Sequence, residues 1–159
     1  MFTQCDTYKN RFKNISQFLI EGVRHYGVDD QTCYPSVTSV LSFISRERIA
    51  AWRQKGGIEA ANAKSKRATT RGTRCHKVWE EYLANRDYET LDEFKVPLVQ
   101  MMFKASKSHL DSRIDNIYQQ ETRMYSRKLC LAGTVDLVCE VDGELAIVDF
   151  KTAEQTKPE

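Results

Sequence analysis

The last third of the sequence most constrains the fold, because its hydrophobic pattern changes there from a helical period to that of β-strands. Residues 121–126, 129–141 and 144–151 are three runs rich in Val, Ile, Leu, Thr and Tyr. The pair Asp142-Gly143 between the last two runs favours a two-residue hairpin turn, which needs positive φ at both positions. The sequence therefore predicts an antiparallel meander of three strands.

Upstream of these strands the apolar spacing is mostly helical. The strongest pattern follows Gly72-Thr73, which should open a helix whose buried stripe ends at Leu83. Ser36 is a candidate N-cap, and Gly56-Gly57 a stop signal. Helices are predicted within 8–28 (around Phe12, Ile15, Phe18 and Leu19) and over 37–44, 49–55, 58–70, 72–83 and 93–118.

These patterns predict an α/β (α+β) fold in which an N-terminal helical layer packs on a mixed sheet containing the meander. A chain of 159 residues with 41% hydrophobic residues has about the usual size of one domain with one core. We expect a single domain over 1–159, divided into a helical basic region (1–71), core helices (72–118) and the strands that carry the site (119–152).

The features that the sequence lacks indicate where the protein is located and whether its cysteines are reduced. No window approaches the roughly 18 consecutive apolar residues of a membrane span, and the first residues have no apolar signal core. We expect a soluble, intracellular protein without a membrane partner. The five cysteines show no Cys-x-x-Cys spacing, which favours reduced, packed thiols over a zinc or iron–sulfur site.

Charge is distributed unevenly along the chain. Residues 46–77 are rich in Arg and Lys with only Glu47 and Glu59 as acids, whereas residues 135–159 carry seven acids against Lys151 and Lys157. A basic stretch of this kind can bind a polyanion such as a nucleic-acid backbone. A solvated helix face is the alternative interpretation.

The predicted hairpin sets two aspartates opposite each other. With a two-residue turn at 142–143, Asp136 pairs with Asp149, and Lys151 shares the face of Asp149 opposite Thr134. Directly opposed like charges destabilise a sheet, so one aspartate must be protonated or a cation must lie between them. Ordinary solvated charges on a surface hairpin are the alternative, but the run 145–151 is nearly continuous in apolar residues, as in a strand buried on both faces.

The position of Glu121 depends on the preceding turn. A two-residue turn at Arg127-Lys128 would pair Glu121 with Thr134, on the face of Asp136. A three-residue loop would turn Glu121 away from that face.

The order of these motifs resembles the PD-(D/E)xK nuclease superfamily. The similarity is closest to its RecB-like branch, and within it to mitochondrial genome maintenance exonucleases and related phage exonucleases. The motifs are Gly72-Thr73-x-x-His76-x-x-x-Glu80, Glu121, Gly133-Thr134-Val135-Asp136-Leu137 and Ile147-Val148-Asp149-Phe150-Lys151-Thr152. This resemblance implies a restriction-endonuclease-like core.

The resemblance also implies a metal site. Asp136 and Asp149 would bind the catalytic metal together with the main-chain carbonyl of Phe150, and His76 would be an extra ligand or would support the ligands. Mg²⁺ prefers carboxylate and water oxygens, and Mn²⁺ suits the same donors.

Other residues would act on the substrate. Lys151 would orient the attacking water or stabilise charge at the phosphate, and Glu121 matches an acidic position of variable role. The basic segment would then hold the phosphate backbone of DNA. The expected contacts are Arg53, Lys66, Arg67, Arg71 and Arg74.

The implied activity is that of a metal-dependent deoxyribonuclease, an exonuclease acting on single-stranded ends or flaps in DNA replication, recombination or repair. The alternative is a nucleic-acid-binding or interaction module that keeps the fold without cutting. A third possibility is an iron–sulfur nuclease, but that would need a cysteine cluster that this sequence does not show.

RecB-like nucleases continue past the Asp-x-Lys strand into a helix and a further strand. Here only eight residues follow Lys151. We therefore expect both elements to be missing, and Ala146, Val148 and Phe150 to be exposed.

Overall fold

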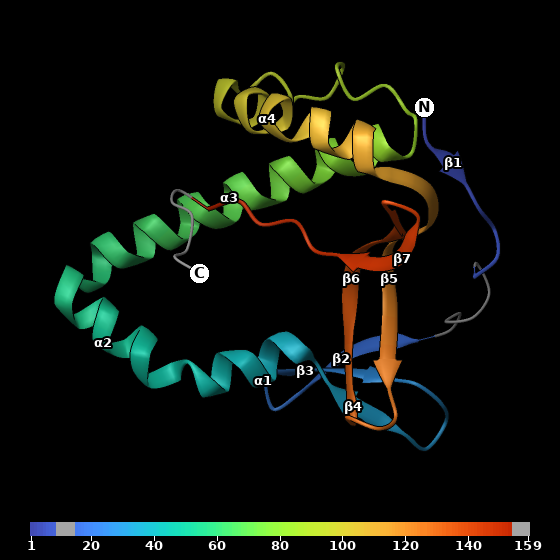
Figure 1. Ribbon diagram of the computed structural model, residues 1–159. Helices are drawn as coiled ribbons and strands as arrows, with labels where there is room; N and C mark the ends of the chain where they lie inside the picture. Colours follow the sequence, from blue (N-terminus) through green and yellow to red (C-terminus); the bar gives the residue numbers. More distant parts are fainter. Residues whose placement is uncertain (9–14, 154–159) are drawn as a thin grey trace.

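The computed structural model describes residues 1–8 and 15–153, which form two sheets and a set of helices (Figure 1). The strands are β1 (Thr3–Gln4), β2 (Ser16–Ile20), β3 (Val23–Gly27), β4 (Cys33–Pro35), β5 (Ile114–Ser126), β6 (Leu131–Val141) and β7 (Glu144–Val148). The helices are α1 (Val37–Ile44), α2 (Arg46–Gly56), α3 (Ile58–Leu83) and α4 (Pro97–Arg113). The fold is α+β.

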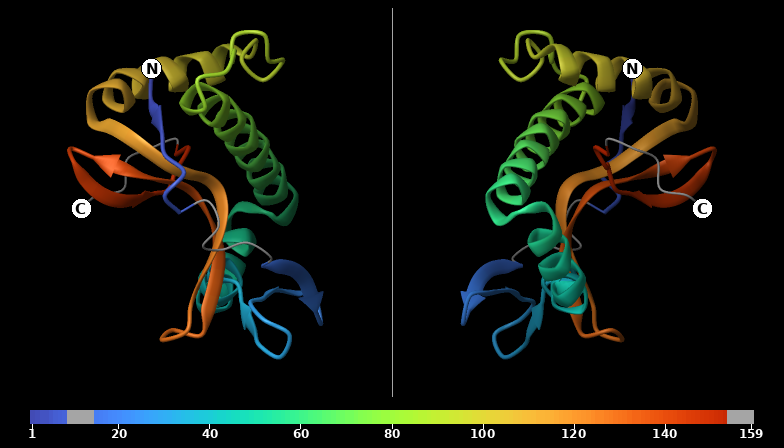
Figure 2. Two further views of the ribbon diagram at one scale, coloured as in Figure 1. Left: turned by 90° about the vertical axis from the view of Figure 1, so that its right-hand side faces the viewer. Right: turned by 90° about the vertical axis from the view of Figure 1, so that its left-hand side faces the viewer.

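The main sheet is mixed, as the sequence predicts. Its strand order is β1-β5-β6-β7, with β1 parallel to β5 and the other pairs antiparallel. The strands β5, β6 and β7 form the predicted meander. Helices α3 and α4 lie on the same side of this sheet (Figure 2), and β2, β3 and β4 form a separate antiparallel sheet.

The turn between β6 and β7 confirms the predicted hairpin register. Val141 pairs with Glu144 across the turn, where Asp142 and Gly143 have φ angles of 54° and 82°. The Arg113 guanidinium fixes the turn, because its Nε donates to a carboxylate oxygen of Asp142 at 2.9 Å. Pairing ends at Val148, so Asp149 lies one residue beyond the ladder.

The connection between β5 and β6 is longer than either length considered above. Four residues, 127–130, separate the paired residues Ser126 and Leu131. Glu121 consequently lies between the pairs Gln120↔Leu137 and Thr122↔Val135, level with Asp136. Its φ of 45° is unusual for a residue other than glycine.

The core lies between α3, α4 and the main sheet. The predicted buried stripe of α3 is confirmed, since Val78, Trp79 and Leu83 are buried there. The Trp79 indole N–H donates to the Ser106 hydroxyl of α4 at 2.9 Å, which satisfies its polar atom inside the core. Leu137 supplies the sheet side of the same cluster.

The prediction of a helix within residues 8–28 was wrong. Residues 16–20 and 23–27 form the hairpin β2–β3, which turns at Glu21 and Gly22 with φ angles of 49° and 77°. These paired positive angles are those of a hairpin turn, which overrides the weak helical spacing. Strands therefore occupy much of the first 35 residues of the expected helical region. Phe12 lies outside the described residues.

Two helix boundaries also differ from prediction. Helix α3 runs unbroken through Gly72, because an isolated glycine costs a helix only about 1 kcal/mol between good helix formers. Helix α4 ends at Arg113, and the predicted helical residues Ile114 and Ile117 belong to β5. Isoleucines three apart fit a helical period, but their branched side chains also suit a buried strand.

The predicted capping of α1 is confirmed. The Ser36 hydroxyl accepts from the N–H of Ser39 at 3.0 Å. Ser36 itself is buried, but Leu41 and Ile44 on this helix are exposed. Val40 is half-buried, so the apolar face of α1 is only partly covered within the described part of the chain.

The expected exposure of Ala146, Val148 and Phe150 was wrong. All three are half-buried, and Val148 and Phe150 pack against the core because they share its face with Leu137. Leu145 and Ile147 on the other face are instead 60% and 61% exposed. Strand β7 is thus an edge strand with one open face, not a strand buried on both faces.

The cysteines only partly match the expectation of packed thiols. Cys75 and Cys139 are buried, and burial raises the pKa of both thiols, that of Cys139 to about 11. Cys33 and Cys130 are exposed. Among the described helices, none combines the length and the apolar character that crossing a membrane requires.

The hairpin β6–β7 offers a matched test of this core. Leu137→Ala removes a side chain with 0% exposure and should lower the free energy of unfolding by about 2–5 kcal/mol. Leu145→Ala on the open face should change it by less than about 0.5 kcal/mol. Urea unfolding followed by circular dichroism measures both, and equal losses would contradict this placement of the core.

Candidate metal centre

Helix α3 and strands β5 and β6 bring three potential metal ligands together. His76, Glu121 and Asp136 each offer one donor atom, and these atoms all lie within 4.8 Å of one another. The His76 Nδ1 is 3.7 Å from Asp136 Oδ1 and 4.0 Å from Glu121 Oε1. Residues distant in sequence thus converge at one point beside the core.

The main chain of Phe150 holds this group in place. Its N–H donates to Asp136 Oδ2 at 2.6 Å, and its carbonyl oxygen lies 2.9 Å from the His76 Nε2. The Phe150 ring stacks on Trp79, with ring centroids 4.8 Å apart. Phe150 therefore links β6 to α3, because its N–H contacts Asp136 and its carbonyl contacts His76.

This arrangement fixes which nitrogen of His76 faces the carboxylates. A carbonyl oxygen can only accept, so Nε2 carries the hydrogen that it donates to Phe150. Nδ1 is then directed at the oxygens of Asp136 and Glu121. A lone pair facing two carboxylates is unfavourable, and a cation bound among the three groups would relieve this repulsion.

The electrostatics of Glu121 reflect the same crowding. Partial burial raises the pKa of the Glu121 carboxyl, and the nearby charge of Asp136 raises it further. Its charged form is therefore disfavoured in the folded protein. Two carboxylates and an imidazole nitrogen at this spacing match the donor set of a divalent cation such as Mg²⁺ or Mn²⁺.

A cavity of 480 Å³ opens beside this group. Its lining residues are Gly72, Thr73, His76, Lys77, Glu80 and Glu121. Sequence reasoning did not assign Lys77 or Glu80 to the site. Glu80 follows His76 by four residues and so lies on the same face of α3, which is the signal that identifies it. The Lys77 ammonium lies 3.4 Å from a Glu80 carboxylate oxygen.

Asp149 and Lys151 lie outside the group of three ligands. Their side chains are 57% and 76% exposed, and they form an ion pair with each other. Asp149 adjoins Phe150, whose amide contacts Asp136. The structure thus places the predicted ligand Asp149 beside the centre and adds Glu121 to it.

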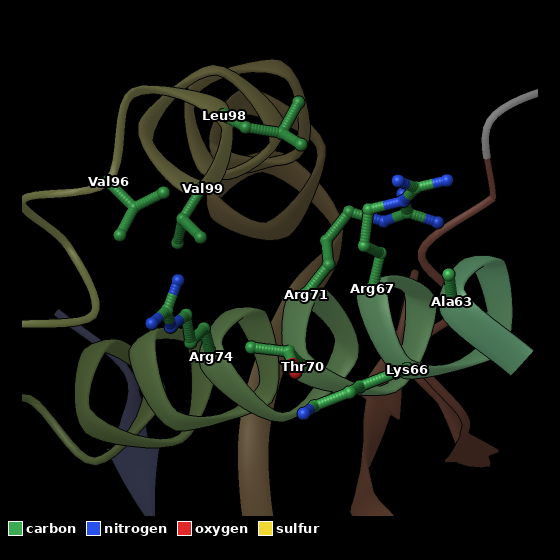
Figure 3. A pocket seen from close by; sticks show the side chains of 9 residues that line it. All are labelled: Ala63, Lys66, Arg67, Thr70, Arg71, Arg74, Val96, Leu98 and Val99. Atoms are coloured by element: carbon green, nitrogen blue, oxygen red, sulfur yellow. The ribbon is translucent and has the colours of Figure 1, made fainter.

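Most of the predicted DNA contacts lie together, but away from the three candidate metal ligands. Lys66, Arg67, Arg71 and Arg74 line a groove of 620 Å³ between α3 and α4 (Figure 3). Arg53 is exposed on α2, away from the groove lining.

Comparison with known proteins gives a distant relative. The chain is 28% identical over 132 residues to human mitochondrial genome maintenance exonuclease 1, an alignment that covers 78% of this chain. It spans 38% of the length of that relative. A comparison with models of protein families gives no match. The similarity supports a relationship to a nuclease family.

The crowding of carboxylates predicts a pH-dependent effect of Glu121→Gln. Because the folded pKa of Glu121 lies above its unfolded value, the favourable contribution of its protonated form is present below the unfolded pKa of about 4.5 and is lost as pH rises through the folded value. In EDTA, Glu121→Gln should therefore raise the melting temperature at pH 7 and change it little at pH 4.

Glu144→Gln is the control for this measurement, because Glu144 is an exposed carboxylate at the start of β7. It should leave the melting temperature unchanged at both pH values. A Glu121→Gln protein that is less stable than wild type at pH 7 in EDTA would show that the crowding has no energetic cost.

Proposed function

We propose that this chain is a metal-dependent deoxyribonuclease that hydrolyses phosphodiester bonds, acting as an exonuclease on single-stranded ends or flaps. The observation that carries the proposal is the convergence of His76, Glu121 and Asp136 around the main chain of Phe150. The relative named above is an exonuclease, which supports the same chemistry. We place the activity in DNA replication, recombination or repair.

Asp136, Glu121 and the Nδ1 of His76 are the groups that would hold the ion. Bound there, Mg²⁺ would neutralise charge on the scissile phosphate and lower the pKa of a coordinated water. The hydrogen bond from Nε2 to Phe150 orients the imidazole so that Nδ1 is free to be a ligand. Phe150 N–H fixes one oxygen of Asp136, which leaves the other oxygen directed at His76.

Asp149 and Lys151 complete the proposed site. The Asp149 carboxylate, which forms an ion pair with Lys151, would be a further ligand beside Asp136. The Lys151 ammonium would then orient the attacking water and donate to a phosphate oxygen. In hydrolysis the water loses a proton as its oxygen bonds to phosphorus, the bridging P–O bond breaks, and the departing oxygen takes a proton to leave as an alcohol.

A second candidate function is nucleic-acid binding without cutting. The ion pair between Asp149 and Lys151 favours it, because both side chains lie outside the ligand group. Binding through the basic groove would not need either residue.

Cleavage of an end-labelled single-stranded oligodeoxynucleotide tests the proposal. The wild-type chain should cut it in Mg²⁺ and not in EDTA. Asp136→Asn keeps an oxygen that can accept from Phe150 but loses the charge, and Lys151→Ala removes the ammonium. Each should lower the rate by about 100-fold or more, the scale of losing one charge-stabilising group.

Lys128→Ala is the matched control, because Lys128 is an exposed lysine in the β5–β6 connection. It should cut as fast as wild type. Metal-dependent cleavage that survives in Lys151→Ala would overturn the assigned role of this lysine. Binding without any turnover in Mg²⁺ or Mn²⁺ would select the second candidate function.

A further inference from the structure

We propose that the groove between α3 and α4 binds the phosphate backbone of a single nucleic-acid strand, at a site separate from the metal centre. The proposal rests on the proposed function for the identity of the polyanion. It adds that the substrate contacts two faces of α3, and that the second face contributes binding and not chemistry.

The lining of the groove is basic and apolar. Among the described residues, its lining includes four cations and no acid. Arg67, Arg71 and Arg74 extend from α3 toward α4, whereas Lys66 runs along the outer side of α3 (Figure 3). Val96, Leu98 and Val99 form the opposite wall. A bound anion would lower the repulsion among these positive charges.

The groove and the metal centre lie on different faces of α3. Successive residues of a helix are about 100° apart, so Thr70 and Arg74 of the groove lie about 200° around the axis from Gly72 and His76 respectively, close to the opposite side of α3. The cavities lined by these two sets share no residue. A strand in the groove is therefore not at the proposed point of cleavage.

The spacing of the cations favours a polymer over a small anion. Lys66 and Arg74 are eight positions apart, or about 12 Å along the helix axis. Arginine forks bind phosphate oxygens with two parallel hydrogen bonds, and the valine and leucine wall suits the apolar faces of sugars and bases. The Arg71 Nη2 also donates to the Thr152 carbonyl at 3.1 Å, so this residue joins the groove to the segment that carries Asp149 and Lys151.

Binding measured without cleavage tests the proposal. Fluorescence anisotropy of a labelled 20-nucleotide oligo-dT is followed in EDTA at several salt concentrations with the full chain. The double variant Arg67→Gln/Arg74→Gln should bind at least about 10-fold more weakly. The slope of log affinity against log salt should fall by about 0.7 for each lost phosphate contact.

The control Lys128→Gln removes one positive charge from the β5–β6 connection and should change neither quantity. Arg71 is left intact, because its bond to Thr152 also holds the segment of the metal centre. Unchanged affinity in the double variant would overturn the proposal. Loss of binding to polyglutamate equal to the loss for oligo-dT would instead identify a general acidic-protein site and would also overturn it.

The readouts keep this proposal apart from the proposed function. If the protein binds oligo-dT through the groove but never cuts it, the groove proposal stands and the proposed nuclease function is overturned. If the protein cuts and the double variant binds as tightly as wild type, the nuclease function stands and the groove proposal is overturned. If both hold, the double variant should raise the KM for cleavage and leave kcat within about twofold.

Discussion

The two hydrogen bonds of the Phe150 main chain are the constraint on which the site depends. Its N–H holds Asp136 of β6, and its carbonyl holds His76 of α3. Both bonds use backbone groups that would otherwise be unpaired where β7 ends, so the end of a strand becomes the point at which helix and sheet are joined. Stacking of the Phe150 ring on Trp79 anchors that point in the core.

Helix α3 organises the charges around this point. Because it continues through Gly72, one rigid element carries His76 on one face and the cations of the groove on another. Asp136 and Glu121 face His76 on the first side, and the described residues that line the groove include no acid. Acidic ligands for a cation and basic contacts for a polyanion are thereby separated by the thickness of a single helix.

The meander and its register could be predicted from the sequence because Asp142-Gly143 fixes the turn locally. The pairing of Val141 with Glu144 follows from that one dipeptide. The relation of Glu121 to Asp136 could not be predicted, because it depends on a four-residue connection and on a positive φ at Glu121, which no local pattern signals. The motif order identified His76 and Asp136, but only the structure shows that Glu121 completes the group and that Asp149 lies beyond the paired part of β7.

The length of the repeating pattern also decided which of the helical predictions were right. The stripe on α3 was predictable because it repeats over more than two turns, whereas residues 16–27 were not, since five-residue strands leave too short a pattern. Gly57 correctly marked a helix boundary, where its φ is 79°, whereas the prediction that Gly72 opens a helix was wrong, since Gly72 lies inside α3. Local sequence predicts structure best where one dipeptide or one long period decides the outcome.

If Asp136 and His76 belong to one divalent-cation site, isothermal titration of the protein with Mn²⁺ should detect it. The wild type should bind Mn²⁺ saturably, Asp136→Asn and His76→Ala should lose that binding, and Glu144→Gln should keep it. Equal Mn²⁺ affinity in wild type and in Asp136→Asn would contradict this assignment of the site.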